Sequence, residues 1–263
     1  METYNIYLST DAGKVRTQNE DNFVVNEITR DITRNSRHIK GEAVQAPLLC
    51  GVFDGMGGEN GGAEASKIAA AVAAEFYRFL RDGNQTIEKR IGDYAENSTK
   101  LIREYLDANR MKRGGTTFVM AYLTAGRAHL FSMGDSRIYL YHEGILRRIS
   151  RDDTLAQKKY EANIFTAAEA VTSNESHVLT RYLGMDAASA EFRVHAYVPV
   201  VLAARDRLLL CSDGLYDMCT EDEIAAVLAQ DDAPYSIELT NAALKKGGED
   251  NITCMVIVPA GKR

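Results

Sequence analysis

One short apolar run, residues 48–53, most constrains the fold, because it ends abruptly in an aspartate and a series of glycines. The run reads Leu-Leu-Cys-Gly-Val-Phe and is followed by Asp54 and Gly55. This pattern predicts a buried strand that delivers a carboxylate to a tight turn. Glycine allows the positive φ and the close backbone approach that an ion or a phosphate requires. Alone, the pair also fits a plain turn, in which Asp-Gly is common.

The same arrangement recurs at three further places. Apolar runs lead into Asp135 and into Asp213, and Asp250 stands just before the apolar residues 252–258. Carboxylates that converge from several strand ends repel one another unless cations lie between them. Oxygen ligands of this kind suit hard ions. The sequence therefore predicts a site for Mg²⁺ or Mn²⁺ rather than Zn²⁺.

Length and charge limit the classes of protein to consider. The chain has 263 residues, 45% of them hydrophobic, and only four prolines. It can bury a full core, and no linker is evident. The net charge is −6, with acidic and basic residues interspersed. Nucleic acid and anionic membranes are therefore poor candidate partners.

Two further patterns bear on the cellular compartment. The N-terminus lacks a basic segment followed by an apolar one, and no apolar stretch approaches the roughly 20 residues of a membrane helix. We expect a soluble, cytoplasmic protein. The four cysteines show no C-x-x-C spacing, and we expect buried, reduced thiols rather than disulfides or a zinc site.

The first sixty residues predict one strand and two polar segments. Residues 3–9 alternate weakly and predict a strand. Residues 10–21 are polar and include Arg16, Glu20 and Asp21. They fit a solvated loop and, equally well, a phosphate-binding arginine beside two acids that hold metal-bound waters. Residues 29–46 resemble a long hairpin or surface loop, to which we assign no chemistry.

Two amphipathic helices are predicted next. Apolar residues recur at Ile68, Val72, Phe76 and Leu80, which predicts a helix that Gly83 ends. A second helix carries its apolar residues on one face. These residues are Ile87, Ile91, Tyr94, Leu101, Ile102 and Tyr105. Both faces are predicted to pack on the core.

The remainder of the chain changes to short β runs. Runs at 118–123, 128–133, 138–141 and 145–149, joined by short turns, predict an antiparallel meander. Residues 151–178 are mostly polar and fit a flap over a site. Helices are predicted at 221–228, with Thr220 as N-cap, and at 236–246, and strands near 192–201, at 208–211 and at 252–258. Together these elements predict an α+β fold in which two antiparallel sheets pack together with helices outside.

Seven short motifs, in order, resemble those of the metal-dependent serine/threonine protein phosphatases of type 2C (the PPM family), particularly the compact bacterial branch. The resemblance spans nearly the whole chain. The motifs are Arg16-x-x-Asn19-Glu20-Asp21, Asp54-Gly55-Met56-Gly57-Gly58, Gly115-Thr116-Thr117, Gly134-Asp135-Ser136-Arg137, Leu179-Thr180-Arg181, Ser212-Asp213-Gly214-Leu215 and Asp250-Asn251-Ile252-Thr253. The family fold, a β-sandwich flanked by pairs of antiparallel helices, agrees with the fold predicted above. The resemblance implies one catalytic domain over residues 1–263, with a flap subdomain at about 151–178.

The resemblance also implies roles for individual residues. Asp54 would bridge two Mn²⁺ or Mg²⁺ ions, and the carbonyl of Gly55 would bind one of them. Asp213 and Asp250 would complete the surroundings of the first ion. Glu20 and Asp21 match the acids that organise waters around the second ion, Asp135 matches one that helps to hold a third, weaker ion, and Arg16 matches the arginine that binds the substrate phosphate.

The implied reaction is hydrolysis of phosphoserine and phosphothreonine. Two cations that share a carboxylate lower the pKa of a bridging water, so that hydroxide can attack phosphorus in line. Arg16 and the metals stabilise the charge on the phosphoryl oxygens, and no phosphoenzyme is needed. Substrates would be phosphoproteins, expected to be products of a serine/threonine kinase, and a monomer is the expected state.

Two positions depart from the family pattern. Met56 stands where some members carry a histidine that is thought to protonate the leaving oxygen, and Asp152-Asp153-Thr154 stands where relatives often carry Asp-His-Ser. The five histidines lie outside every motif and are expected to be surface or sheet residues. They are His38, His129, His142, His177 and His195. We therefore hypothesise that a metal-bound water is the proton donor.

Two alternative functions remain open from the sequence. A phosphatase for small phosphomonoesters would use the same metals on another substrate. A catalytically silent sensor on the same fold should have lost acids such as Asp54, Asp213 and Asp250, yet all three are present. Costly clusters of carboxylates usually mark working sites, which favours an enzyme over the sensor.

Overall fold

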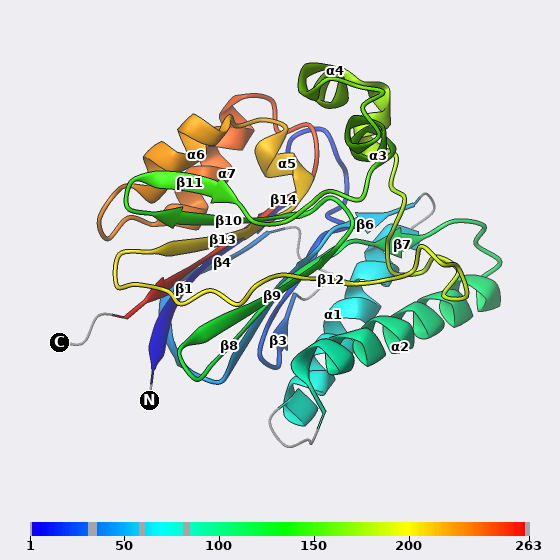
Figure 1. Cartoon of the computed structure of the whole chain (residues 1–263), viewed down its shortest axis with the longest axis horizontal. Helices are drawn as coiled ribbons and strands as arrows, with labels where there is room; N and C mark the ends of the chain where they lie inside the picture. The colour runs from blue at the N-terminus through cyan, green and yellow to red at the C-terminus, as the bar shows by residue number, and fades with distance from the viewer. Residues whose placement is uncertain (1, 31–35, 58–60, 81–84, 261–263) are drawn as a thin grey trace.

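Two six-stranded antiparallel sheets pack between two layers of helices in the computed structural model, which describes residues 2–30, 36–57, 61–80 and 85–260 (Figure 1). The predicted α+β sandwich is confirmed. In order, the first sheet contains β11 (Ile145–Arg148), β10 (Arg137–His142), β13 (Arg207–Cys211), β14 (Ile252–Pro259), β1 (Thr3–Asp11) and β4 (Arg37–Gln45). The second contains β12 (His195–Ala196), β9 (Arg127–Met133), β8 (Phe118–Thr124), β5 (Leu48–Phe53), β2 (Asn22–Val25) and β3 (Ile28–Thr29).

Helices cover the outer faces of both sheets (Figure 1). The second sheet is covered by α1 (Gly61–Leu80) and α2 (Ile87–Ala108), and the first by α5 (Asp213–Tyr216), α6 (Glu221–Leu228) and α7 (Tyr235–Lys245). The flap contains α3 (Leu155–Glu161), α4 (Ala167–Thr172) and the 3₁₀ helix η1 (Asn174–His177). A short pair of strands, β6 (Gly55–Met56) and β7 (Gly115–Thr116), lies near the flap.

Each interface between layers has its own apolar cluster. Ile6, Leu48 and Met255 belong to the cluster between the sheets. Ala69 and Tyr94 belong to the cluster that joins α1 and α2 to the second sheet, and a third cluster joins α5, α6 and α7 to the first sheet. Burial of apolar surface at all three interfaces supplies the main stabilisation of the sandwich. The four cysteines are buried and unpaired, as predicted.

The predicted helices are confirmed, with small differences at single residues. Thr220 caps α6, its side chain accepting from the backbone N–H of Glu223 while Glu223 accepts from the backbone N–H of Thr220. This reciprocal pair fixes the start of the helix where the sequence placed it. On α2, Leu101 is 37% exposed and does not join the core face, which is a correction. Gly83, the predicted end of the first helix, lies outside the described residues.

The predicted meander is wrong, because the four strands form two hairpins in different sheets. The pair β8 and β9 belongs to the second sheet, whereas β10 and β11 belong to the first. Residues 134–136 carry the chain across the roughly 10 Å that separates packed sheets. A short connection does not decide which sheet the next strand joins. That choice depends on which arrangement buries the apolar face of each strand. The crossing begins at Gly134, which has φ +106°.

Two other segments differ from the prediction. Residues 29–46, predicted as a loop or hairpin, contain β4, a nine-residue strand at the edge of the first sheet. Its exposed face is polar, and an exposed edge strand resembles a loop in sequence. Near residues 192–201 only β12 forms, with an isolated bridge between Ala128 and Val200. No helix of the described residues has the length and apolar character needed to cross a bilayer.

Candidate metal centre

Carboxylates from both sheets meet in one cleft of about 630 Å³. Asp54 follows β5 of the second sheet, whereas Asp213 follows β13 and Asp250 precedes β14 of the first. The cleft is also lined by Arg16, Thr17, Gln18, Glu20, Gly55, Met56, Gly57, His177 and Asn251. Six of the eight site residues chosen from the sequence therefore line it. The other two, Asp21 and Asp135, lie directly beside it.

Hydrogen bonds fix the turn that carries Asp54. The backbone N–H of Asp54 donates to Oγ1 of Thr117 at 3.1 Å, and the Asp54 carbonyl accepts from the Thr117 N–H at 2.9 Å. The hydroxyl of Thr116 donates to the same carbonyl at 2.8 Å. Thr117 also shares a hydrogen bond with Ser136, which follows Asp135. One pair of threonines thus fixes two of the acidic turns relative to each other.

Gly55 has no room for a side chain. A Cβ atom there would lie 2.4 Å from the carbonyl oxygen of Gly62 and 2.5 Å from that of Glu20. The start of α1 therefore packs directly against the turn that carries Asp54, and the absence of a Cβ permits that approach. Gly57, with φ +130°, supplies the next sharp change of direction.

Asn251 holds the Arg16–Glu20 segment against Asp250. Its Oδ1 accepts from the backbone N–H of Glu20 at 2.7 Å, and its Nδ2 donates to the carbonyls of Ala12 and Gln18, both at 2.9 Å. Three bonds from one buried amide order a polar segment that would otherwise be a solvated loop. The loop is thereby brought to the cleft, which supports the functional reading of these residues.

Asp21 lies behind the cleft. Its side chain is fully buried, and Oδ2 accepts from the hydroxyl of Ser212 at 2.8 Å. Oδ1 has no hydrogen-bond partner among the described residues. Burial raises the pKa of Asp21 to about 7, with Asp213 and Asp250 adding to the effect. A buried carboxylate oxygen without a partner is costly unless a cation or water satisfies it.

Burial and mutual repulsion raise the pKa values of several acids in this group. Burial, followed by Asp213 and other neighbouring carboxylates, raises the pKa of Asp54 well above its usual range. Burial and the charge of Asp217 raise the pKa of Asp213 to about 6. The pKa of Asp135 is raised by burial and by Asp213. Divalent ions would reverse these shifts, because they stabilise the ionised carboxylates.

Arg16 extends into the cleft from a partly exposed loop. Its guanidinium donates to Oδ2 of Asp250 at 2.7 Å, and 57% of its side chain is exposed. The other carboxylate oxygen of Asp250, Oδ1, accepts a hydrogen bond from the backbone N–H of Asn251. The remaining N–H groups of Arg16 offer the planar donor geometry that suits a phosphate.

His177 is a residue of the cleft that the sequence interpretation missed. It lies at the end of η1, with Nδ1 3.8 Å from Oδ2 of Asp217 and 4.0 Å from Oδ2 of Asp213. Single ligand atoms of Asp135, His177 and Asp213 lie within 4.8 Å of one another. His177 is exposed, as expected of a surface residue, but it also lines the cleft, which the sequence interpretation did not indicate. Its place at the end of the predicted flap was the available signal.

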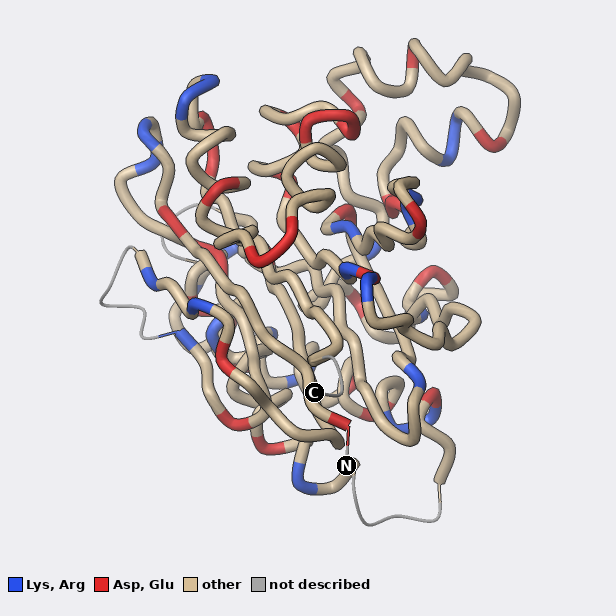
Figure 2. Tube along the Cα trace, turned by 90° about the vertical axis from the view of Figure 1, so that its left-hand side faces the viewer, with Lys and Arg blue, Asp and Glu red and all other residues tan. Residues whose placement is uncertain are grey.

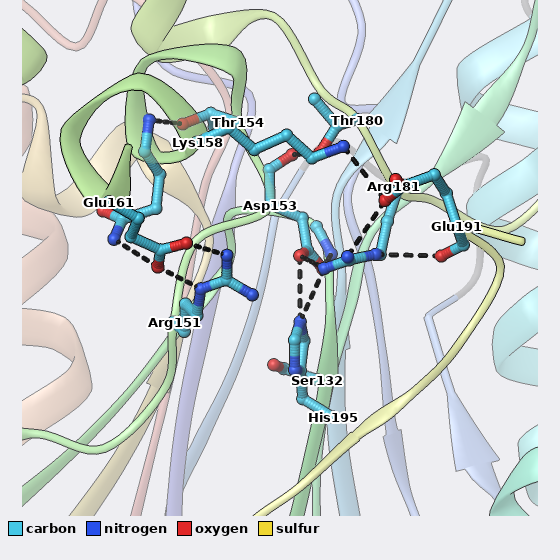
Figure 3. Close-up of polar contacts among 12 residues, drawn as sticks. Ser132, Arg151, Asp153, Thr154, Lys158, Glu161, Thr180, Arg181, Glu191 and His195 are labelled. Atoms are coloured by element: carbon cyan, nitrogen blue, oxygen red, sulfur yellow. Dashed lines mark hydrogen bonds and ion pairs between the residues drawn. The ribbon is translucent and has the colours of Figure 1, made fainter. Parts of the chain in front are cut away.

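A buried ion network closes the base of the flap (Figure 3). The Asp153 carboxylate, fully buried, contacts the guanidinium of Arg181 at 2.5 Å and Nε2 of His195 at 2.9 Å, and accepts from the N–H of Gly134 at 3.1 Å. The Asp153 carbonyl accepts from the N–H of Thr180 at 2.7 Å. Asp153 therefore joins both ends of the flap to the turn that precedes Asp135. The altered Asp152-Asp153-Thr154 motif supports the flap through this network.

The donor set fits divalent metal ions. Asp21 and Asp135 are buried and the other acids are half-buried, burial and neighbouring carboxylates raise the pKa values of Asp54 and Asp213, and Asp21 has a buried oxygen without a partner among the described residues. Gly55 lines the cleft and adds backbone to the carboxylates there. Carboxylates and carbonyls are the ligands that Mg²⁺ and Mn²⁺ prefer.

Comparisons with known proteins agree on one family. The family model described as protein phosphatase 2C matches residues 28–253. The serine/threonine phosphatase stp of Listeria monocytogenes is 30% identical over 94% of this chain and 93% of its own. The solved structure of the Mycobacterium tuberculosis phosphatase PstP/Ppp matches with a TM-score of 0.78 and 27% identity, over 97% of this chain and 98% of its own. A PstP catalytic domain solved with two manganese ions matches with a TM-score of 0.77 and 26% identity, over 99% of this chain and 100% of its own.

Proposed function

Because the chain belongs to the protein phosphatase 2C family and is a metal-dependent serine/threonine protein phosphatase, we propose that the acidic cleft is its catalytic centre. The observation that carries this assignment is the convergence of Asp54, Asp213 and Asp250 with Arg16 in one cleft. Carboxylates that could bind metal ions thus lie beside Arg16, whose guanidinium can bind a phosphate.

The metal ions would be held by residues whose position suits that role. Asp54, the Gly55 carbonyl, Asp213 and Asp250 would hold two Mn²⁺ or Mg²⁺ ions, the number that the related PstP structure contains. Glu20, which lines the cleft, and Asp21, behind it, would complete the surroundings of the second ion. Asp135 would bind a third, weaker ion. When bound, such ions activate a water for attack and neutralise the phosphate charge.

The chain itself supplies orientation and charge. Arg16 would bind two non-bridging oxygens of the phosphate and hold phosphorus in line for attack. Asn251 keeps Arg16 and Glu20 in place through its three backbone contacts. The four cysteines are buried and do not line the cleft. This arrangement favours direct hydrolysis over a cysteinyl-phosphate intermediate.

Three broader properties follow as proposals. Residues 1–263 act as one catalytic domain, with the flap at about 151–178 as a subdomain over the site. Phosphorylated proteins are the substrates, and a serine/threonine kinase supplies them. The enzyme works as a cytoplasmic monomer. Figure 2 shows basic residues lying among acidic ones along the trace, which agrees with the argument against nucleic acid and anionic membranes as partners.

The direct test is phosphate release from a phosphothreonine peptide by the purified protein, with Mn²⁺, with Mg²⁺ and with chelator. We expect ion-dependent release that falls by at least roughly 100-fold in Asp213→Asn, because a metal ligand is lost. Asp93→Asn, on the exposed face of α2, is the matched control. Turnover of free phosphorylated metabolites equal to that of the peptide would favour the small-molecule alternative. If the folded protein releases no phosphate with any ion, the assignment is refuted.

A further inference from the structure

A second hollow adjoins the catalytic cleft. It has a volume of about 530 Å³ and lies between α2, the loop at residues 111–114 and the loop at 182–186. Met56 and Gly57 line both the hollow and the cleft. A chain that placed its phosphorylated side chain in the cleft would therefore pass directly into this hollow on one side.

Methionines make up half of the apolar lining. Met56, Met111 and Met185 line the hollow together with Leu106, Leu179 and Tyr182, and we call it the methionine groove. Thioether side chains are flexible and polarizable, and they adapt to apolar groups of different shape. The groove therefore suits an apolar side chain without demanding one particular residue.

The rim of the methionine groove is basic. Arg103, Lys112 and Arg113 stand against two carboxylates, Asp107 and Asp186. Arg103 lies 3.8 Å from Asp186, in a pair that is largely exposed. Among the described residues, neither Lys112 nor Arg113 has an ion-pair partner, and both are exposed. On a chain with a net charge of −6, this local excess of positive charge is a specific feature.

A third hollow adjoins the cleft at His177 and has a different lining. Its volume is about 650 Å³, and two arginines and three acids line it. Both arginines already pair with Asp152, and Arg137 lies over the ring of Tyr216. Of the described residues that line these two hollows, basic side chains without an ion-pair partner are therefore found only in the methionine groove. The two flanks of a bound substrate meet different chemistry.

The geometry points to a substrate preference, and this inference rests on the proposed function. We infer that the methionine groove binds the segment on one flank of the phosphorylated residue, with an apolar side chain among the methionines and an acidic side chain at Lys112 and Arg113. In an extended chain, successive side chains point to opposite faces. A substrate can therefore present an apolar group to the floor and a carboxylate to the rim.

The test compares phosphothreonine peptides that differ on one flank at a time. Each flank carries Leu-Glu, Leu-Lys or Ser-Ser near the phosphothreonine, and kcat/KM is measured with Mn²⁺ at low salt. We expect the Leu-Glu peptide to be preferred on one flank only, by roughly fivefold over Leu-Lys. The preference should fall as salt rises, because exposed charges are screened.

Reversing the charge of the two rim residues tests whether they cause the preference for the Leu-Glu peptide. The Lys112→Glu/Arg113→Glu double variant should lose the preference for Leu-Glu, mainly through KM, and should hydrolyse p-nitrophenyl phosphate at the wild-type rate. Lys40→Glu/Lys89→Glu makes the same change of charge at exposed positions outside the groove, and should keep the preference. Met185→Gln should reduce the advantage of Leu over Ser at the same flank.

The outcomes separate this inference from the proposed function. Peptide hydrolysis that is equal for all flanks, or a preference that survives in the double variant, overturns the groove assignment and leaves the phosphatase intact. A matched loss in the control variant shows a general charge effect and also overturns it. Absence of peptide hydrolysis in the wild-type protein refutes the proposed function itself.

Discussion

Arg16 and Asp250 hold opposite charges 2.7 Å apart at the mouth of the cleft. The guanidinium has N–H groups to spare for a phosphate, whereas an alanine has none. Arg16→Ala should therefore lower kcat/KM for a phosphopeptide by roughly 10- to 100-fold, the cost of losing charge-assisted hydrogen bonds. Arg16→Lys should recover only part of it, since an ammonium cannot bind two oxygens in the plane of a guanidinium.

The control for Arg16 is Arg78→Ala, which removes an exposed arginine paired with Glu27. It should leave kcat/KM unchanged. Full activity in Arg16→Ala would show that the phosphate is held by other groups.

His177 offers a second test of single side chains. We hypothesise that a metal-bound water, rather than a histidine, protonates the leaving oxygen. Under that hypothesis His177→Gln keeps the alkaline limb of the kcat/KM profile against pH and changes kcat by less than about tenfold. Loss of the alkaline limb, with the 10²- to 10⁴-fold drop typical of a missing general acid, would make the imidazole the proton donor. His142→Gln, on β10, is the control.

At the scale of elements, the flap is held by the buried charges of Asp153 and Arg181. Removing the Asp153 charge leaves the buried Arg181 with the more exposed Glu191 as its ion-pair partner, and breaking a buried pair costs about 3–5 kcal/mol. Asp153→Asn should therefore lower the free energy of unfolding by an amount in that range. Urea denaturation monitored by circular dichroism measures it.

The matched control is Glu161→Gln, which breaks the more exposed pair with Arg151 at the same flap. It should cost less than about 1 kcal/mol. Similar losses in the two variants would show that the Asp153 network does not stabilise the flap base more than a surface ion pair does.

Elements whose boundaries are set locally were predictable from the sequence. Thr220 and Glu223 complete a capping pair within four residues, so the start of α6 could be read directly. The sheet that a strand joins depends on distant faces, and the crossing at Gly134 could not be distinguished from an ordinary turn. The same distinction applies to the site. The aspartates carry a local pattern, whereas His177 lines the cleft only because the tertiary fold brings η1 to it.

For the whole molecule, the raised pKa values make stability depend on pH. Asp213 has a pKa of about 6 and Asp21 of about 7, both above the 3.8 of a free aspartate. The folded state therefore binds more protons than the unfolded state between pH 5 and 7. The free energy of unfolding of the metal-free protein should fall as pH rises through that window.

Melting temperature in chelator, measured at intervals from pH 5 to 7, tests this dependence. Added Mn²⁺ should raise the melting temperature, and more at pH 7 than at pH 5, because protons compete with the ion for the same carboxylates. Asp21→Asn should flatten the slope in chelator. A melting temperature that climbs with pH in the absence of metal would contradict the assignment.

The aspartates of the cleft come from both sheets, Asp54 after β5 and Asp213 after β13. An ion bound by both would act as a reversible cross-link between the two halves of the sandwich, at one end only. Amide hydrogen exchange near Phe53 and Cys211 should therefore slow when the ion binds, while exchange at the far ends of the same strands should change little. Catalysis and cohesion of the sheets would then depend on the same few oxygen atoms.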